Sequence, residues 1–188
     1  MHTMKLMLVV AALSASLAAA FVPHRAGQEP REPTLHEAYY VTSGRLRILV
    51  PGNWSWRETA AGNADPRATV RSITIDPGGH GLLRLAQYTT DEPAEDRLDA
   101  AITRYLEGNE ELARAPYGRW GAVEGVGAVV RFEAPDGTTH RLRVVVDRDD
   151  DGRVVEAHLL ATDDASGTLD KGFMFIERTL EITDPAGG

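Results

Sequence analysis

Three aspartates in one short segment have the spacing in this sequence that comes nearest to a metal-binding motif. Asp147, Asp149 and Asp151 alternate in the run from 147 to Gly152. The run matches the first half of an EF-hand calcium loop, where positions 1, 3 and 5 supply carboxylates and a glycine at position 6 makes the turn. Position 12, which should supply a bidentate glutamate, is His158. The segment therefore predicts either a weak calcium site or an acidic hairpin turn, because Asp and Gly both favour turns.

The histidines offer one candidate base. His80 lies in a glycine-rich run, from Asp76 to Gly81, and could serve as a general base. A general base needs a partner, and none is near His80 in the sequence, so a solvated turn residue is the alternative. By strand parity we expect His140 to point inward and His158 outward. No H-x-x-x-H or H-E-x-x-H spacing exists, so a zinc site would have to be assembled in space.

Three tryptophans are the candidate ligand-binding aromatics. Trp54, Trp56 and Trp120 could line a groove, together with His80 as a polar neighbour. The alternative is that they pack in or near the core, the commoner position of tryptophan. The sequence has neither a G-x-S-x-G elbow nor a phosphate-binding glycine loop, so neither serine hydrolase nor nucleotide-binding chemistry is indicated.

Composition excludes several classes of protein. The chain has 188 residues, no cysteine and a formal net charge of −8. Without cysteine there is no disulfide, thiolate nucleophile or thiolate-bound zinc, so stability must come from packing. The basic residues are scattered, and an acidic chain repels nucleic acid at long range. We expect no nucleic-acid partner and no cofactor other than the possible calcium ion.

The first twenty residues have the order of a secretory signal peptide. Lys5 is followed by an apolar run and then by Ala18-Ala19-Ala20. The run is short for a spanning helix, which needs about 20 strongly apolar residues. We therefore expect cleavage after Ala20, no stable membrane insertion afterwards, and a secreted or periplasmic product.

The remaining chain divides into a tether, one domain and a short tail. Residues 21–37 are rich in proline and mixed charge, which predicts a flexible tether. Residues 38–183 form the expected domain, long enough to bury a substantial core. Residues 184–188 are the expected tail.

Six segments have the alternation of β-strands. The pattern predicts strands over 45–50, 69–76, 82–88, 126–132, 140–146 and 154–161, with turn signals between most of them. Charged side chains at alternate positions, including Arg131, Arg141, Arg143 and Glu156, are expected to face outward and to pair across strands.

Two segments have helical spacing instead. Leu98, Ile102 and Tyr105 lie on one face of a helix predicted over 93–107, with Pro93 at its start and Gly108 after its end. A second helix is predicted from Leu169 to Leu180. The order β-β-β-α-β-β-β-α predicts an α+β fold in which helices pack on an antiparallel sheet.

The first strand and its exit form a motif of their own. Val50-Pro51-Gly52-Asn53-Trp54 follows directly on that strand, and the element order runs on to a closing helix. Both features resemble the PsbP/Mog1-like proteins over about residues 38–183. The resemblance implies an α-β-α sandwich and a non-enzymatic role. None of that family's functional residues can be transferred to a position here.

Together these observations predict an exported, non-enzymatic binding or accessory module of the cell envelope or secreted fraction. Two alternatives stay open. One is an envelope hydrolase with a site around His80, and the other is a calcium-stabilised structural domain.

Overall fold

The computed structural model describes residues 30–61 and 70–183. The predicted signal peptide, most of the tether and the tail lie outside these residues. The first described element is a short 3-10 helix, Leu35–Glu37, and strands and two longer helices follow it. The strands are β1 (Tyr39–Ser43), β2 (Leu46–Val50), β3 (Ser55–Ala61), β4 (Val70–Asp76), β5 (Gly81–Thr89), β6 (Glu110–Pro116), β7 (Arg119–Trp120), β8 (Val123–Glu124), β9 (Val126–Glu133), β10 (Thr139–Arg148), β11 (Arg153–Thr162) and β12 (Glu181–Ile182).

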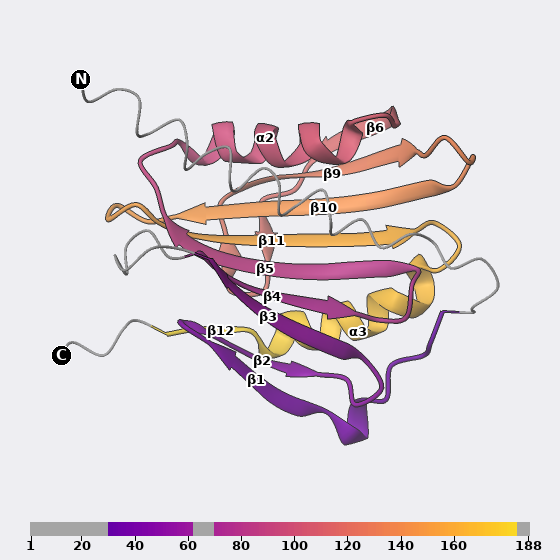
Figure 1. Ribbon diagram of the computed structural model, residues 1–188, viewed down its shortest axis with the longest axis horizontal. Helices are drawn as coiled ribbons and strands as arrows, with labels where there is room; N and C mark the ends of the chain where they lie inside the picture. Colours follow the sequence, from indigo (N-terminus) through magenta and orange to yellow (C-terminus); the bar gives the residue numbers. More distant parts are fainter. Residues whose placement is uncertain (1–29, 62–69, 184–188) are drawn as a thin grey trace.

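A seven-stranded antiparallel sheet is the centre of the fold (Figure 1). Its strand order is β3-β4-β5-β11-β10-β9-β6. A smaller sheet, β1-β2-β12, lies beside it, and β7 pairs with β8. The α+β prediction is confirmed, and each of the six predicted strands is present with boundaries shifted by at most two residues.

Helix α2 (Ala94–Leu106) covers one face of the large sheet, over β9 and β10. Ala101 and Ile102 are buried, and Leu98 and Tyr105 pack against the same cluster. The helical spacing in the sequence predicted that Leu98, Ile102 and Tyr105 would share this face of the helix. The chain leaves the helix through Gly108, whose φ of 75° is accessible to glycine at little cost.

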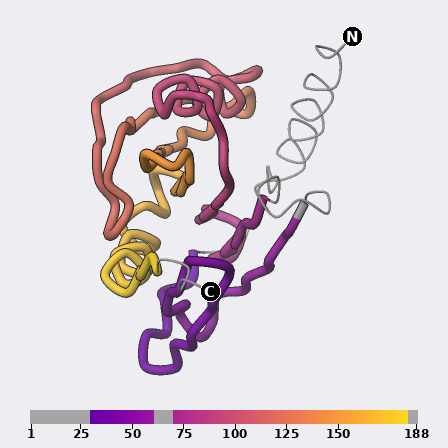
Figure 2. Tube along the Cα trace, turned by 90° about the vertical axis from the view of Figure 1, so that its left-hand side faces the viewer, coloured from indigo at the N-terminus to yellow at the C-terminus, as the bar shows by residue number. Residues whose placement is uncertain are grey.

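Helix α3 (Ser166–Thr179) and the small sheet cover the other face. Leu169, Phe173 and Ile176 recur at helical spacing and are fully or almost fully buried. Phe173 meets the Trp54 ring edge-on, at a centroid distance of 5.5 Å. Gly172 makes room for that indole, because a side chain there would overlap it. The two helices thus lie apart, α2 beside β9 and β10 and α3 beside the small sheet (Figure 2).

Gln87 joins the two sheets. Its side-chain Oε1 accepts a hydrogen bond from the backbone N–H of Arg45 at 2.9 Å, and its Nε2 donates to the carbonyl of Ser43 at 2.5 Å. Both partners belong to the β1–β2 turn around Gly44, whose φ is 55°. A side chain on Gly44 would collide with the Gln87 amide, so both the conformation and the contact require glycine.

Two expectations about strand faces are wrong, those that place His158 and Glu156 outward, whereas His140 points inward as expected. Val144 pairs with His158 and Phe132 with His140, which places both histidines on the α2 face of the sheet. Glu156 lies on that face too and is buried, although it was expected outside. The cause is that β11 is covered on both sides, so alternation along it does not separate core from solvent.

None of the helices within residues 30–61 and 70–183 is long and apolar enough to cross a membrane.

Candidate functional site

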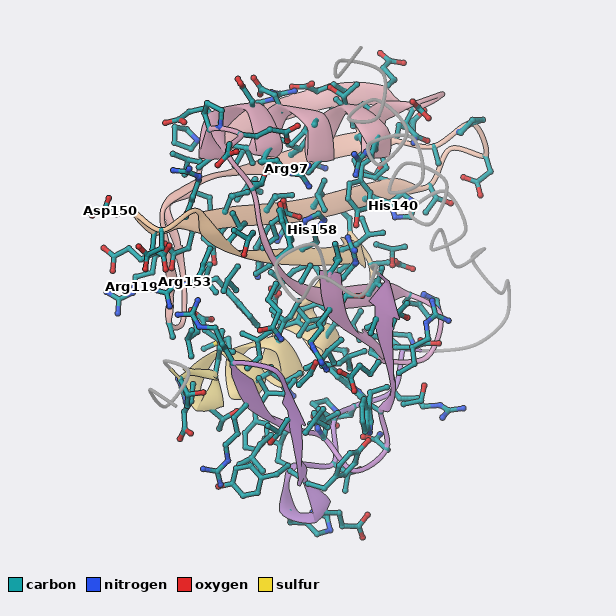
Figure 3. The ribbon with its side chains drawn as sticks, turned by 60° about the vertical axis from the view of Figure 1, so that its left-hand side comes forward. Arg97, Arg119, His140, Asp150, Arg153 and His158 are labelled. Atoms are coloured by element: carbon teal, nitrogen blue, oxygen red, sulfur yellow. The ribbon has the colours of Figure 1, made fainter. Side chains whose placement is uncertain are left out.

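A buried cluster of ionisable side chains lies between α2 and the large sheet. Strand β11 supplies Glu156 and His158, β5 supplies Tyr88, and α2 supplies Arg97 and Tyr105. Glu156 is 3% exposed and His158 is 1% exposed. Figure 3 shows His158 on the sheet and Arg97 on α2 above it.

The cluster is a continuous chain of hydrogen bonds centred on Glu156. Arg97 Nε donates to Glu156 Oε1 at 3.2 Å and to the Tyr88 hydroxyl oxygen at 2.8 Å. The Tyr88 hydroxyl in turn donates to the same Oε1. The other carboxylate oxygen, Oε2, is 3.2 Å from His158 Nε2. His158 Nδ1 is 3.4 Å from the Tyr105 hydroxyl, which completes the chain.

These contacts determine the charge state of the cluster. Burial alone would raise the pKa of Glu156, but the hydrogen bond and charge of His158, with the charge of Arg97, lower it to about 2. Burial raises the pKa of Tyr105 to about 12. Burial and the neighbouring Glu156 carboxylate raise the pKa of Tyr88 as well. At neutral pH Glu156 is therefore an ion with both oxygens occupied.

Chemically, the cluster is suited to holding α2 on the sheet. A general acid or base must come within hydrogen-bond reach of a substrate atom. Glu156 and His158 are buried beneath α2 and hydrogen-bond to protein side chains. A buried ion pair with satisfied hydrogen bonds fixes the position of the elements that carry it.

The structure separates the candidate tryptophans. Trp54 and Trp120 are buried in the α3-side core, at 2% and 0% exposure. Trp56, on edge strand β3, is 40% exposed. The three rings therefore do not line a common groove, and Trp56 alone of the three presents its ring to solvent.

His80 lies in the turn between β4 and β5, and it is buried. Its carbonyl accepts a hydrogen bond from the Thr162 N–H at 2.9 Å. The pKa of the nearby Asp164 carboxyl is lowered, most strongly by the Thr162 side chain and also by the charge of His80. Asp164 was not identified from the sequence as a neighbour of His80, because the two residues are 84 positions apart in the chain.

The acidic turn joins β10 to β11. Asp149 accepts hydrogen bonds from the backbone N–H and the Nε of Arg153, at 2.9 and 2.7 Å. Arg153 also reaches Asp151, at 2.8 Å. Asp147 lies where burial and the Asp149 charge raise its carboxyl pKa. Within the described residues, no group of three or more His, Asp or Glu side chains is arranged to hold a metal ion.

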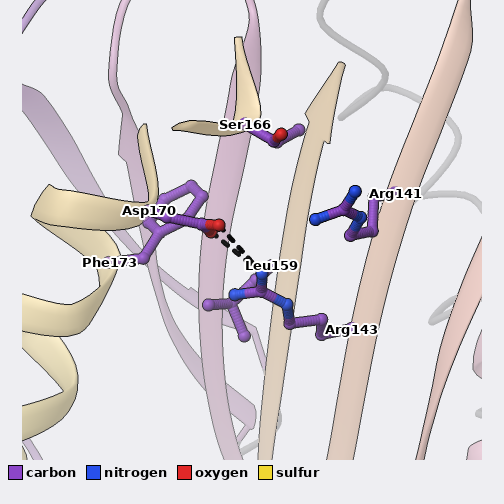
Figure 4. Close-up of a pocket in the computed structure, with 7 residues that line it drawn as sticks. Arg141, Arg143, Leu159, Ser166, Asp170 and Phe173 are labelled. Carbon is purple, nitrogen blue, oxygen red and sulfur yellow. Dashed lines mark hydrogen bonds and ion pairs between the residues drawn. The ribbon is translucent and has the colours of Figure 1, made fainter. Parts of the chain in front are cut away.

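A shallow hollow lies between α3 and β10 (Figure 4). Two arginines of β10, Arg141 and Arg143, face Ser166 and Asp170 of α3 across it. Leu159, Ala161 and Phe173 supply its apolar lining. Arg143 pairs with Asp170 at 3.0 Å. The sequence pattern marked the two arginines only as outward-facing strand residues.

Comparison with known proteins gives likenesses of fold. No family model matches the chain, and no match was found among curated proteins. PsbP (CyanoP) of Synechocystis sp. PCC 6803 is a similar solved structure, with 11% identity, 78% of this chain and 92% of that chain covered, and a TM-score of 0.47. LpqN of Mycobacterium tuberculosis, which is involved in cell envelope biogenesis, gives 16% identity, coverages of 78% and 91%, and a TM-score of 0.43.

A protein from Bacteroides thetaiotaomicron VPI-5482 is also similar, with 12% identity, 79% of this chain covered and a TM-score of 0.46. The chain spans about half of that protein, 49% of its length. PsbP belongs to the group of proteins that the strand, Pro51-Gly52 and Trp54 resemble in sequence. The three structures are 11–16% identical to this chain.

Proposed function

We propose that this chain is an exported, non-enzymatic binding or accessory module of the cell envelope or secreted fraction. In this proposal residues 1–20 are a cleaved leader, 21–37 a tether and 38–183 one folded domain. The observation that carries the proposal is the exposed indole of Trp56 on edge strand β3.

Trp56 lies where a partner can reach both a side chain and a backbone. Tryptophan buries a large area with few rotatable bonds and is enriched at binding hot spots. Among the described strands, β3 is one edge of the large sheet, so its outer backbone groups are available to an added strand. The neighbouring β1 carries a second exposed aromatic residue, Tyr40, at 60% exposure, and Ser43 joins β1 to β3 through Glu58 at 2.5 Å.

Photo-crosslinking from position 56 tests the proposal. A photoreactive phenylalanine at position 56 should yield a discrete crosslinked partner in the intact host cell. The same group at Met174, an exposed apolar residue of α3, is the matched control and should not yield that product. Equal products from both positions, or none from position 56, would refute the assignment of this surface.

Export is tested separately. The purified protein from the envelope or secreted fraction should begin at Phe21, as read by mass spectrometry of its N-terminal peptide. A chain that keeps residues 1–20 and stays in the cytoplasm would contradict the exported part of the proposal and leave the crosslinking result standing.

A hydrolase centred on His80 is the second candidate, because the charge of His80 influences the Asp164 carboxyl. A general base is commonly a histidine that a carboxylate orients, and Asp164 is the candidate orienting group here. Hydrolysis of a panel of activated esters that is abolished by His80→Gln, with unfolding unchanged, would favour this candidate over the binding module.

A further inference from the structure

The arginines beside α3 form a cationic row on a protein of net charge −8. Arg131 of β9 and Arg141 of β10 lie directly opposite each other, and Arg143 is two residues further along β10 on the same face. Like charges directly opposite in a sheet are destabilising. The row therefore costs stability unless another group compensates for it.

Two carboxylates compensate for part of this charge. Asp163 pairs with Arg131 at 2.6 Å and with Arg141 at 3.5 Å. Asp170 pairs with Arg143 at 3.0 Å. Three guanidinium groups thus share two carboxylates in these ion pairs.

Arg141 is the least satisfied member of the row. A guanidinium has five N–H donors. Among the described residues, the Asp163 contact at 3.5 Å is the only ion pair of Arg141, and it is longer than a charge-assisted hydrogen bond of 2.7–2.9 Å. Its side chain is 34% exposed and lines the hollow (Figure 4).

The surroundings of Arg141 define what the hollow can accept. The guanidinium fork matches the two oxygens of a carboxylate or a phosphate. Leu159 and Phe173 form the apolar floor of the hollow and are themselves almost fully buried, so the polar rim supplies the contacts to a ligand. The Asp170 carboxylate also faces the hollow, but Arg143 neutralises it.

We propose that the hollow between α3 and β10 binds the oxyanion of a small organic acid or phosphate, with Arg141 as the principal ligand and Arg143 as the second. The anion would supply the hydrogen-bond acceptors that Arg141 lacks and would relieve its repulsion with Arg131. This site is separate from the Trp56 surface and does not depend on the proposed function.

Titration of the arginine side-chain Nε–Hε signals by NMR tests the site. Butyrate and inorganic phosphate are the two probes, added separately to the full chain at constant ionic strength, with sodium chloride as the reference. Saturable shifts of Arg141 and Arg143 are expected. Tighter binding of butyrate would identify the ligand as an organic acid, and tighter binding of phosphate would identify it as a phosphate.

Variants distinguish binding at this site from nonspecific attraction between anions and surface arginines. Arg141→Gln should weaken binding at least tenfold, and Arg141→Lys should weaken it less. Arg119→Gln is the matched control, because Arg119 is an exposed arginine with one long pair, 3.7 Å to Glu124, and it should leave the affinity unchanged.

Three results would overturn the proposal. They are shifts that do not saturate, shifts that sodium chloride reproduces, and equal weakening by Arg119→Gln. If Arg141→Gln fails to fold, the titration of the unmodified chain still decides, since unsaturable or absent Arg141 shifts refute the site.

Discussion

The two faces of the large sheet are held by different physical means. On the α3 side, Trp54, Trp120 and Phe173 pack in an apolar layer. On the α2 side, Glu156 and Arg97 form a buried ion pair inside the helix–sheet interface. Apolar packing stabilises in proportion to buried area, whereas a buried ion pair gains little net stability but fixes which groups must meet. The difference suggests that α3 supplies stability and that the charged cluster fixes the position of α2.

The largest effect is expected in the apolar layer. Phe173→Ala should lower the free energy of unfolding by about 3–5 kcal/mol, because it removes a buried ring and leaves a cavity beside Trp54. Urea unfolding followed by circular dichroism measures the loss. Met174→Ala, at the adjacent exposed position, is the control and should stay within about 0.5 kcal/mol. Similar losses for the two variants would show that Phe173 is not a core residue.

Glu156→Gln should cost about 3 kcal/mol, because Arg97 would lose its buried counter-charge and keep only its pair with the half-exposed Glu92. Replacing both partners, in Arg97→Met with Glu156→Leu, should cost less than the single change. Glu111→Gln removes an exposed carboxylate paired with Arg114 and should cost at most about 1 kcal/mol. Additive costs in the double variant would mean that the pair is not a coupled unit.

The pH dependence of stability distinguishes the two faces further. The pKa of Glu156 is about 2 in the folded chain and 4.5 as the ordinary value. Its contribution is therefore fully present above about pH 4.5 and is lost as the pH falls toward 2. The stability difference between the unmodified chain and Glu156→Gln should shrink over this range. Phe173→Ala, in contrast, should differ from the unmodified chain by an amount that does not change with pH.

The smallest effect is expected at the acidic turn, away from both layers. Arg153 occupies Asp149 and Asp151, so calcium would have to displace existing ion pairs. The melting temperature should be the same in chelator and in one millimolar calcium, consistent with an affinity of about millimolar or weaker. A rise of several degrees that Asp149→Asn abolishes would contradict this and favour the calcium-stabilised alternative.

The elements with one exposed side could be predicted from the sequence. Helix α2 shows its period because Ile102 is buried while the opposite side is polar. The edge strand β6 gave no signal, since all seven of its residues are exposed and no apolar alternation exists. Strand β3 was missed for a similar reason, as its charged and small residues obscure the pattern around Trp56.

The buried cluster could not be predicted, because its members come together only through long-range pairing. Glu156 and His158 alternate with apolar residues, and this pattern is typical of a strand that has one solvent-exposed face. Helix α2 covers that face instead, and it brings Arg97 from 59 positions away. The useful signal was the Glu-x-His spacing within a strand of otherwise buried residues, which a search for catalytic motifs overlooks.

The Gln87 contacts make the small sheet part of the same cooperative unit as the large one. Opening the β1–β2 turn would leave the buried Gln87 amide without its two backbone partners, and it would expose Leu46 and Ile48. Local opening of that hairpin therefore costs nearly as much as unfolding its surroundings. In a hydrogen-exchange experiment, the backbone amide hydrogens of β2 should exchange as slowly as those of β5. A peripheral hairpin that opens by itself would exchange faster.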